Sequence, residues 1–203
     1  MTGPERFSQG KGSTMDEAEV ERIFRVTNAL LFGHFELRSG LHSDQFFQCA
    51  KVLQYPTWTA RLCSELAERL RAMKVEVETV IAPAMGGLFV GHELARSLDR
   101  RSIFAEKQDD RLVLRRGFRI AAGERFVVAE DVVTRGGRVQ ETIDIVRAAE
   151  GVVSAVAVLV DRSGGRAAFD APCVSLLRMT PTTWEPKDCP LCRKSVPLEH
   201  PGS

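Results

Sequence analysis

Two patterns of apolar residues alternate along the chain. In one, apolar residues form short runs; in the other, they recur every three to four residues, as in a helix. The runs Val77–Ala82, Phe126–Ala129 and Val152–Val160 predict strands that are covered on both faces. Residues 56–73 and 138–149 carry apolar side chains at helical spacing, which predicts two helices. Strands that alternate with helices predict an α/β domain with a mostly parallel central sheet flanked by helices.

Weaker patterns complete the expected element order. Met15–Phe32 has the spacing of an amphipathic helix, and residues 33–48 contain two short extended segments separated by a turn. Lys107–Arg111 is a charged connection without an apolar anchor, which predicts a mobile loop. The remaining expected elements are a helix at Leu88–Leu98 and extended segments at Ser102–Ala105, Leu112–Leu114 and Cys173–Leu177.

The length and composition are those of one globular domain. The chain has 203 residues, of which 1–14 form a polar stretch that predicts a disordered tail. We expect one folded domain over residues 15–180 and an irregular tail over residues 181–203. A net charge of +1 argues against nucleic acid or a membrane as a partner. Five cysteines and the lack of a secretory signal favour a reduced, cytoplasmic setting.

The most informative segment is RFVVAEDVVTRGGR, residues 125–138. A buried strand leads to the adjacent carboxylates Glu130 and Asp131, and residues 134–137 must then form a tight turn into a helix. Consecutive glycines allow backbone N–H groups to surround an anion, and the helix N-terminus adds positive charge. Because carboxylates repel phosphate, their presence indicates sugar hydroxyls or a hydrated magnesium ion. The segment predicts a site for a phosphorylated sugar.

Two further features lie at the predicted ends of strands. Residues 82–87 form a second glycine-containing turn before a helix, and such turns on adjacent strands would face one crevice. Close packing between strand and helix explains these glycines equally well. Arg162 follows another buried strand and needs an acidic partner or a ligand. From the residues alone, pairing with Asp161 and exposure to solvent are the simpler interpretations.

The C-terminal segment contains a pair of cysteines with zinc-knuckle spacing. Cys189 and Cys192 supply two ligands, whereas a closed structural zinc site needs four. No second paired spacing occurs among the other cysteines and His200, which favours two free thiols over zinc or redox chemistry. A structural role is expected for the remaining histidines, His34, His42 and His92.

Residues 125–138 resemble the phosphoribosyl-diphosphate (PRPP) signature of the type I phosphoribosyltransferases, in which two acidic and two apolar residues precede Thr and a Gly-rich turn. Arg135 and Arg138 depart from this pattern, in which small or hydroxyl residues are usual. The resemblance implies the type I phosphoribosyltransferase fold. The PRPP-binding residues that it implies are Lys107, Glu130, Asp131, Val132, Val133, Thr134, Arg135, Gly136, Gly137, Arg138 and Arg38.

The N-terminal segments FELRSG and SDQFF resemble the orotate phosphoribosyltransferase branch of that family. In this branch they belong to a small N-terminal hood, here at about residues 15–50, that helps to cover the base. The resemblance makes Arg162 the partner of the orotate carboxylate, because a guanidinium binds a carboxylate through two parallel bonds. The orotate-binding residues that it implies are Thr134, Arg162, Phe46 and Phe47.

The implied reaction transfers ribose 5-phosphate from PRPP to orotate and gives orotidine 5′-monophosphate and diphosphate, as in de novo UMP biosynthesis. Lys107, Glu130 and Asp131 are the implied catalytic residues, and a homodimer would share the Lys107 loop across its interface. Mg²⁺ is the implied cofactor; it would have no direct protein ligand and would arrive bound to PRPP, with Asp131 as a contact through water.

Two other functions stay open at this point. A phosphoribosyltransferase for purine bases would keep the signature without needing the hood segment or Arg162. A non-catalytic regulator that binds PRPP or nucleotides would be expected to carry a basic face or an added nucleic-acid module. In the family an Arg precedes the loop Lys, and Glu106 stands at that position here. The near-zero net charge argues against the regulator, whereas the departures at Arg135, Arg138 and Glu106 leave it open.

Overall fold

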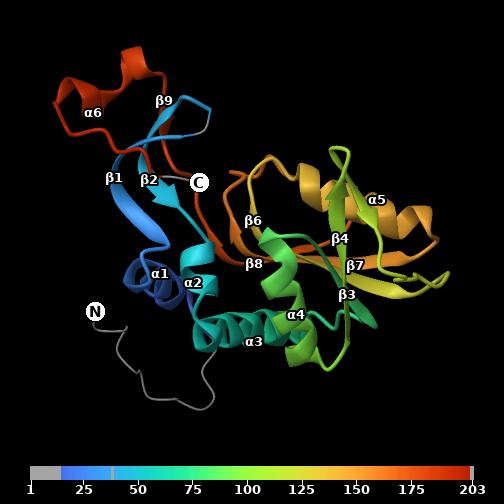
Figure 1. The fold of residues 1–203 in the computed structure, drawn as a ribbon. Coiled ribbons are helices and arrows are strands. Elements are labelled where there is room, and N and C mark those ends of the chain that lie inside the picture. Colours follow the sequence, from blue (N-terminus) through green and yellow to red (C-terminus); the bar gives the residue numbers. More distant parts are fainter. Residues whose placement is uncertain (1–14, 38, 202–203) are drawn as a thin grey trace.

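The computed structural model describes residues 15–37 and 39–201, and its larger part is one six-stranded sheet (Figure 1). The strand order is β5-β4-β3-β6-β7-β8, with β5 antiparallel to β4 and all other neighbours parallel. The mostly parallel α/β architecture is therefore confirmed. The strands are β3 (Thr79–Pro83), β4 (Arg101–Gln108), β5 (Arg111–Leu114), β6 (Arg125–Val133), β7 (Val152–Asp161) and β8 (Cys173–Arg178).

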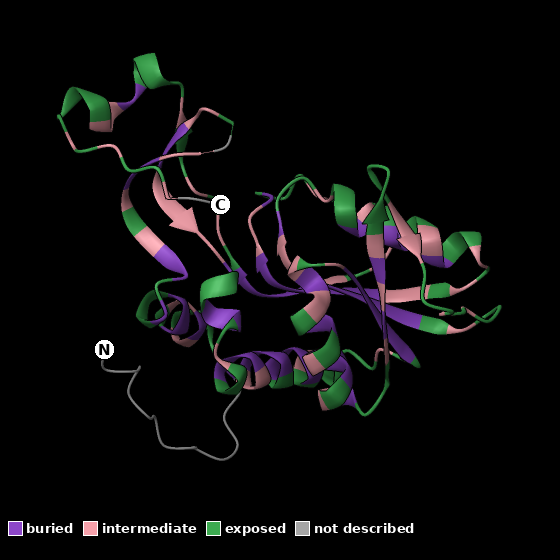
Figure 2. Cartoon of the chain, viewed as in Figure 1, coloured by how far each residue is buried: buried purple, intermediate pink, exposed green. Residues whose placement is uncertain are grey.

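Helices cover both faces of this sheet. Val127 and Ala129 of β6 belong to the core shared with α1, α3 and α4, whereas Phe126 and Val128 point to the opposite face, which α5 covers. Figure 2 shows the resulting buried strands through the centre of the molecule. The helices are α1 (Glu17–Val26), α2 (Ala50–Leu53), α3 (Pro56–Ala72), α4 (Gly86–Leu98) and α5 (Gly137–Ala148).

The chain connections open a crevice between two neighbouring strands. β3 continues through α4 to β4, and β6 continues through α5 to β7, so the chain leaves β3 and β6 in opposite directions. In an open parallel sheet, ligands bind at the carboxyl ends of two such strands. The two glycine-containing turns lie at these ends, as the sequence predicts.

A second, smaller sheet stands beside the carboxyl ends of the large one (Figure 1). We call it the hood, and it comprises residues 30–47 and 183–199. Its antiparallel strand order is β1-β2-β9, and Glu199 returns to form a parallel bridge with Phe35. The hood elements are β1 (Leu30–Glu36), β2 (His42–Phe47), β9 (Thr183–Trp184), the 3₁₀ helix η1 (Pro186–Asp188) and α6 (Pro190–Arg193).

The first helix is shorter than the sequence pattern predicts. α1 ends at Val26, and Asn28 adopts the left-handed φ of 56° that terminates helices. The backbone N–H of Ala29 donates to the carbonyl of Phe24 at 2.8 Å and closes this end. The continued apolar spacing to Phe32 therefore belongs to strand β1.

The charged connection and the C-terminal tail are also more ordered in secondary structure than expected. Residues 107–111 lie in a tight hairpin between β4 and β5, since Asp109 and Asp110 take φ values of 47° and 66° that suit a two-residue turn. Residues 183–199 build part of the hood, where an irregular tail is expected. The expected disordered tail, residues 1–14, lies outside the described residues. Among the described helices, none combines the length and apolar character needed to cross a membrane.

Candidate active site

The acidic pair, Glu130 and Asp131, lies near the carboxyl end of β6 and borders the crevice. Glu130 is buried and its Oε1 accepts the N–H of Asp131 at 3.1 Å, while Asp131 is half-buried. Burial, with the charge of Asp131 as the second cause, raises the pKa of Glu130 from 4.5 to about 9. Glu130 is therefore protonated at neutral pH in the ligand-free protein. Its proton reduces the repulsion that two adjacent carboxylates would exert on a phosphate.

The signature turn, residues 134–137, has the geometry of an anion site. Gly136 takes a φ of 80° and precedes the first turn of α5, whose N-terminus has no side-chain cap. The positive φ of Gly136 favours glycine, and a Cβ there would also crowd the ring of Phe169 at 3.1 Å. Thr134, Arg135 and Arg138 are exposed around this turn, and Arg138 lies close enough to Glu130 to oppose the rise in its pKa.

The turn between β3 and α4 packs directly against the acidic pair. A Cβ at Gly86 would lie 3.0 Å from Oδ1 of Asp131, and one at Gly87 would lie 2.9 Å from Oε1 of Glu130. The peptide bond between Ala84 and the following Met is cis, and α4 begins without a side-chain cap. The glycines therefore serve close packing, and the same packing brings the uncapped N-terminus of α4 to the crevice, so the two interpretations of this turn are compatible.

Arg162 is a half-buried charge without an acidic protein partner among the described residues. Its backbone N–H donates to Val133 at 2.8 Å, which fixes it beside the signature strand. Within residues 15–37 and 39–201, its guanidinium makes no hydrogen bond or ion pair, and burial lowers its pKa. The alternative partner Asp161 instead accepts the N–H of Ser163 at 2.8 Å. The guanidinium is thus available to a ligand.

The two aromatic residues expected around the base separate in the structure. Phe47 lies beside Arg162, whose guanidinium carbon is 5.9 Å from the ring centroid, and also packs against Phe24. Phe46 points to the other face of β2 and packs against Phe35, with ring centroids 5.8 Å apart. Among the candidate ligand-binding residues that the structure describes, Phe47 lies beside Arg162, and no such contact is described for Phe46.

Lys107 stands apart from the acidic pair. It is exposed and forms an ion pair with Asp110 on its own hairpin at 2.6 Å, and no described hydrogen bond or ion pair joins it to another candidate residue. Ala105 pairs with Pro83 at the end of β3, so Lys107 extends past β3 at the edge that carries the site, where it pairs with Leu112 of β5. Glu106, which departs from the family pattern, pairs with Arg116 at 2.9 Å and braces the hairpin.

The remaining candidate residues either belong to strand β6 or lie outside the described residues. Val133 is buried in the core under α5, and Val132 is half-buried and pairs with β7. Arg38 lies outside the described residues. Cys49 is a site residue that sequence reasoning misses, and its buried thiol lies 3.8 Å from the carbonyl oxygen of Asp131. Burial raises the pKa of this thiol, and no local motif marks it because the contact joins α2 to β6.

Comparisons with known proteins identify relatives over nearly the whole chain. The family model for the phosphoribosyl transferase domain matches residues 57–192. The chain is 50% identical over 189 residues to the orotate phosphoribosyltransferase of Caldicellulosiruptor bescii, covering 93% of this chain and 98% of the relative. It is 48% identical to that of Heliobacterium modesticaldum, covering 93% of this chain and 99% of the relative.

Solved structures share the fold at lower identity. The crystal structure of orotate phosphoribosyltransferase from Aeropyrum pernix superposes with a TM-score of 0.66 at 22% identity, over 79% of this chain and 93% of that one. Adenine phosphoribosyltransferase from Thermoanaerobacter pseudethanolicus gives a TM-score of 0.58 at 17% identity, over 66% of this chain and 88% of that one. Both likenesses establish the fold and leave the base to be argued from the site.

Proposed function

Given that the chain belongs to the phosphoribosyltransferase family, in the orotate phosphoribosyltransferase branch, we propose that it transfers ribose 5-phosphate from PRPP to orotate. The products are orotidine 5′-monophosphate and diphosphate, within de novo UMP biosynthesis. The five free cysteines are consistent with a reducing compartment such as the cytoplasm.

The observation that carries the choice of base is the unpaired guanidinium of Arg162. A half-buried cation without a partner is unfavourable, and the carboxylate of orotate would supply two parallel hydrogen bonds to it. Phe47 beside it offers an apolar surface to the pyrimidine ring. A purine base has no carboxylate and would leave Arg162 unpaired, so the purine alternative explains this residue less well.

The crevice offers separate subsites to the parts of PRPP. Backbone N–H groups of the signature turn and the start of α5 suit the 5′-phosphate, with Arg138 as an additional charged donor. The start of α4 suits the diphosphate, because its first turn is uncapped and faces the same crevice. Between the two helix ends, Glu130 and Asp131 suit the ribose hydroxyls, as a protonated carboxyl can donate a hydrogen bond and a carboxylate can accept one.

The protein must stabilise the positive charge that develops at the anomeric carbon of the ribose during the reaction. Departure of diphosphate leaves a ribosyl group with oxocarbenium character, which Asp131 would stabilise electrostatically from the crevice. Mg²⁺ bound to PRPP would neutralise the leaving group, and the partly exposed Asp131 fits a contact to it through water. Lys107 would add positive charge near the diphosphate if the β4–β5 hairpin of one subunit reaches the site of its partner in a homodimer.

Substitution of Arg162 tests the assignment of orotate. Arg162→Ala should weaken orotate binding by roughly 2–3 kcal/mol, which is roughly 30- to 150-fold, and change PRPP binding little. Titration calorimetry with each substrate and steady-state kinetics measure the two effects separately. Arg178→Ala is the matched control, because Arg178 is an exposed arginine at the carboxyl end of the neighbouring strand β8. Equal losses for orotate and PRPP would remove Arg162 as the partner of the carboxylate.

A further inference from the structure

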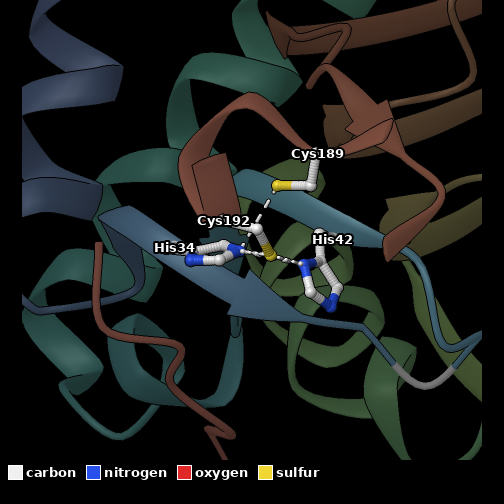
Figure 3. Close-up of side chains that lie close together, drawn as sticks. All are labelled: His34, His42, Cys189 and Cys192. Atoms are coloured by element: carbon white, nitrogen blue, oxygen red, sulfur yellow. Dashed lines mark hydrogen bonds between the residues drawn. The ribbon is translucent and has the colours of Figure 1, made fainter. Parts of the chain in front are cut away.

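Four side chains with metal-binding atoms meet in the hood, away from the crevice. His34 belongs to β1, His42 begins β2, and Cys189 and Cys192 flank the start of α6 (Figure 3). Their nearest ligand atoms all lie within 4.8 Å of one another. The sequence interpretation of two free thiols and two structural histidines therefore misses that the fold assembles them into a single cluster.

The distances match the edges of a small tetrahedron. Zinc lies about 2.3 Å from sulfur and about 2.05 Å from nitrogen, so tetrahedral edges are about 3.3 Å between nitrogens and about 3.6 Å between nitrogen and sulfur. Nε2 of His34 is 2.9 Å from Nδ1 of His42 and 3.4 Å from Sγ of Cys189. Sγ of Cys192 is 3.3 Å from Nδ1 of His42 and 3.7 Å from Nε2 of His34. These four of the six separations are close to the tetrahedral edges, and all six are within 4.8 Å, so modest shifts would place the four atoms around one ion.

A hydrogen bond outside the cluster prepares His34 as a ligand. Nδ1 of His34 lies 2.9 Å from the carbonyl oxygen of Val196, which can only accept, so Nδ1 carries the proton. In the neutral ring this leaves the lone pair of Nε2 directed at the other three ligand atoms. Metal-binding histidines commonly have their second nitrogen fixed in this way.

The cluster is mostly buried, which distinguishes it from a chance contact between surface side chains. His34, His42 and Cys189 are 1%, 5% and 0% exposed, and only Cys192 reaches the surface. Figure 3 shows the two rings and both sulfur atoms pointing toward one another from β1, β2 and the α6 segment. Two imidazoles and two thiolates form a donor set that suits zinc, whereas magnesium and calcium prefer oxygen.

We propose that His34, His42, Cys189 and Cys192 form a tetrahedral structural zinc site that ties the C-terminal segment to the hood hairpin. Four protein ligands complete the coordination of the ion and leave no position for a substrate, which makes the site structural. It joins residues 155 positions apart in the sequence, His34 and Cys189, and among the described hood residues only Leu30 is a buried member of an apolar core cluster. Metal ions commonly stabilise such small units.

Metal analysis of the untagged protein tests this proposal independently of its catalytic function. Protein purified under reducing conditions from zinc-supplemented cells should contain about one zinc per chain. Cys192→Ser, at the exposed ligand, and the double variant Cys189→Ser/Cys192→Ser should lose that zinc. Cys173→Ser is the matched control and should retain it, because Cys173 is a half-buried thiol on β8 outside the cluster. Stoichiometric zinc in the double variant would overturn the proposal.

Two further measurements exclude loss of folding as the cause. Replacement of zinc by Co²⁺ in the wild-type protein should give the visible absorption of a tetrahedral site together with thiolate charge-transfer bands. Cys192 should resist alkylation in the zinc-loaded protein and react after strong chelation, while the melting temperature falls. A wild-type protein that contains no zinc, or that carries a disulfide between Cys189 and Cys192 after reducing purification, would contradict a zinc site.

Discussion

Glu130 holds a proton at neutral pH in the ligand-free protein because it is buried beside a second acidic side chain. Gly87 and Gly86 of the facing turn approach these carboxyl groups closely, because a Cβ would lie 2.9 Å from Glu130 at Gly87 and 3.0 Å from Asp131 at Gly86. The acidic pair is therefore enclosed by the backbone of α4 on one side and open to the crevice on the other. Ligand hydroxyls can reach the pair from the crevice side.

The raised pKa of Glu130 predicts a pH-dependent stability. Between about 4.5 and about 9 the folded chain binds a proton at Glu130 that the unfolded chain has released. The free energy of unfolding should therefore fall as pH rises through this window, by about 6 kcal/mol at most. Urea unfolding of the ligand-free protein at several pH values measures the slope.

The control for this prediction uses a matched pair of variants. Glu130→Gln removes the titrating group and should flatten the pH dependence, whereas Glu150→Gln, at an exposed position, should leave it as in the wild type. Identical slopes for Glu130→Gln and the wild-type protein would show that Glu130 does not hold the proton.

At the residue scale, the sequence was informative where a motif is local. Glu130, Asp131 and Gly136 lie within one strand–turn–helix unit, so spacing alone placed them together. The environment of Cys49 and the convergence of His34 with Cys189 depend on contacts between distant segments, which a spacing pattern cannot encode. For Arg162, the sequence predicts the position at the end of a strand, but it cannot predict that the guanidinium lacks an acidic protein partner.

At the scale of elements, the sequence predicts those with apolar periodicity. The buried strands β3, β6 and β7 and helices α3 and α5 lie where the apolar patterns place them. Strand β9 and helix α6 were missed because they are short and rich in polar residues and proline, and because the hood supplies their packing partners. The sequence predicts a loop at the β4–β5 hairpin because its turn, Asp109 and Asp110, lacks the glycine that usually marks such turns.

The β4–β5 hairpin leads to a prediction about Lys107. If its side chain neutralises the departing diphosphate, Lys107→Ala should lower kcat by roughly 100-fold with little change in PRPP affinity. Gln108→Ala is the matched control, because Gln108 follows Lys107 on the same strand and is exposed like it but carries no charge. Stopped-flow or steady-state kinetics with a separate PRPP titration distinguish the two parameters. An unchanged kcat would remove Lys107 from the mechanism.

At the scale of the whole molecule, the reaction site lies where the hood meets the large sheet. Phe47 of the hood lies beside Arg162 at the end of β7, and the acidic pair lies on the adjacent strand β6. The base would thus be held between hood and core, and the phosphates at the helix N-termini. Stabilising the hood by zinc would then serve the base subsite indirectly, through the position of β2.

The most direct test of the central claim is a turnover assay with a panel of bases. Wild-type protein mixed with PRPP, Mg²⁺ and either orotate, adenine, hypoxanthine or guanine is followed by the absorbance of each base, with Arg162→Ala protein in parallel. We predict turnover with orotate alone and its severe loss at the same orotate concentration in the variant. Turnover with a purine but not with orotate, or PRPP binding without turnover of any base, would contradict the account.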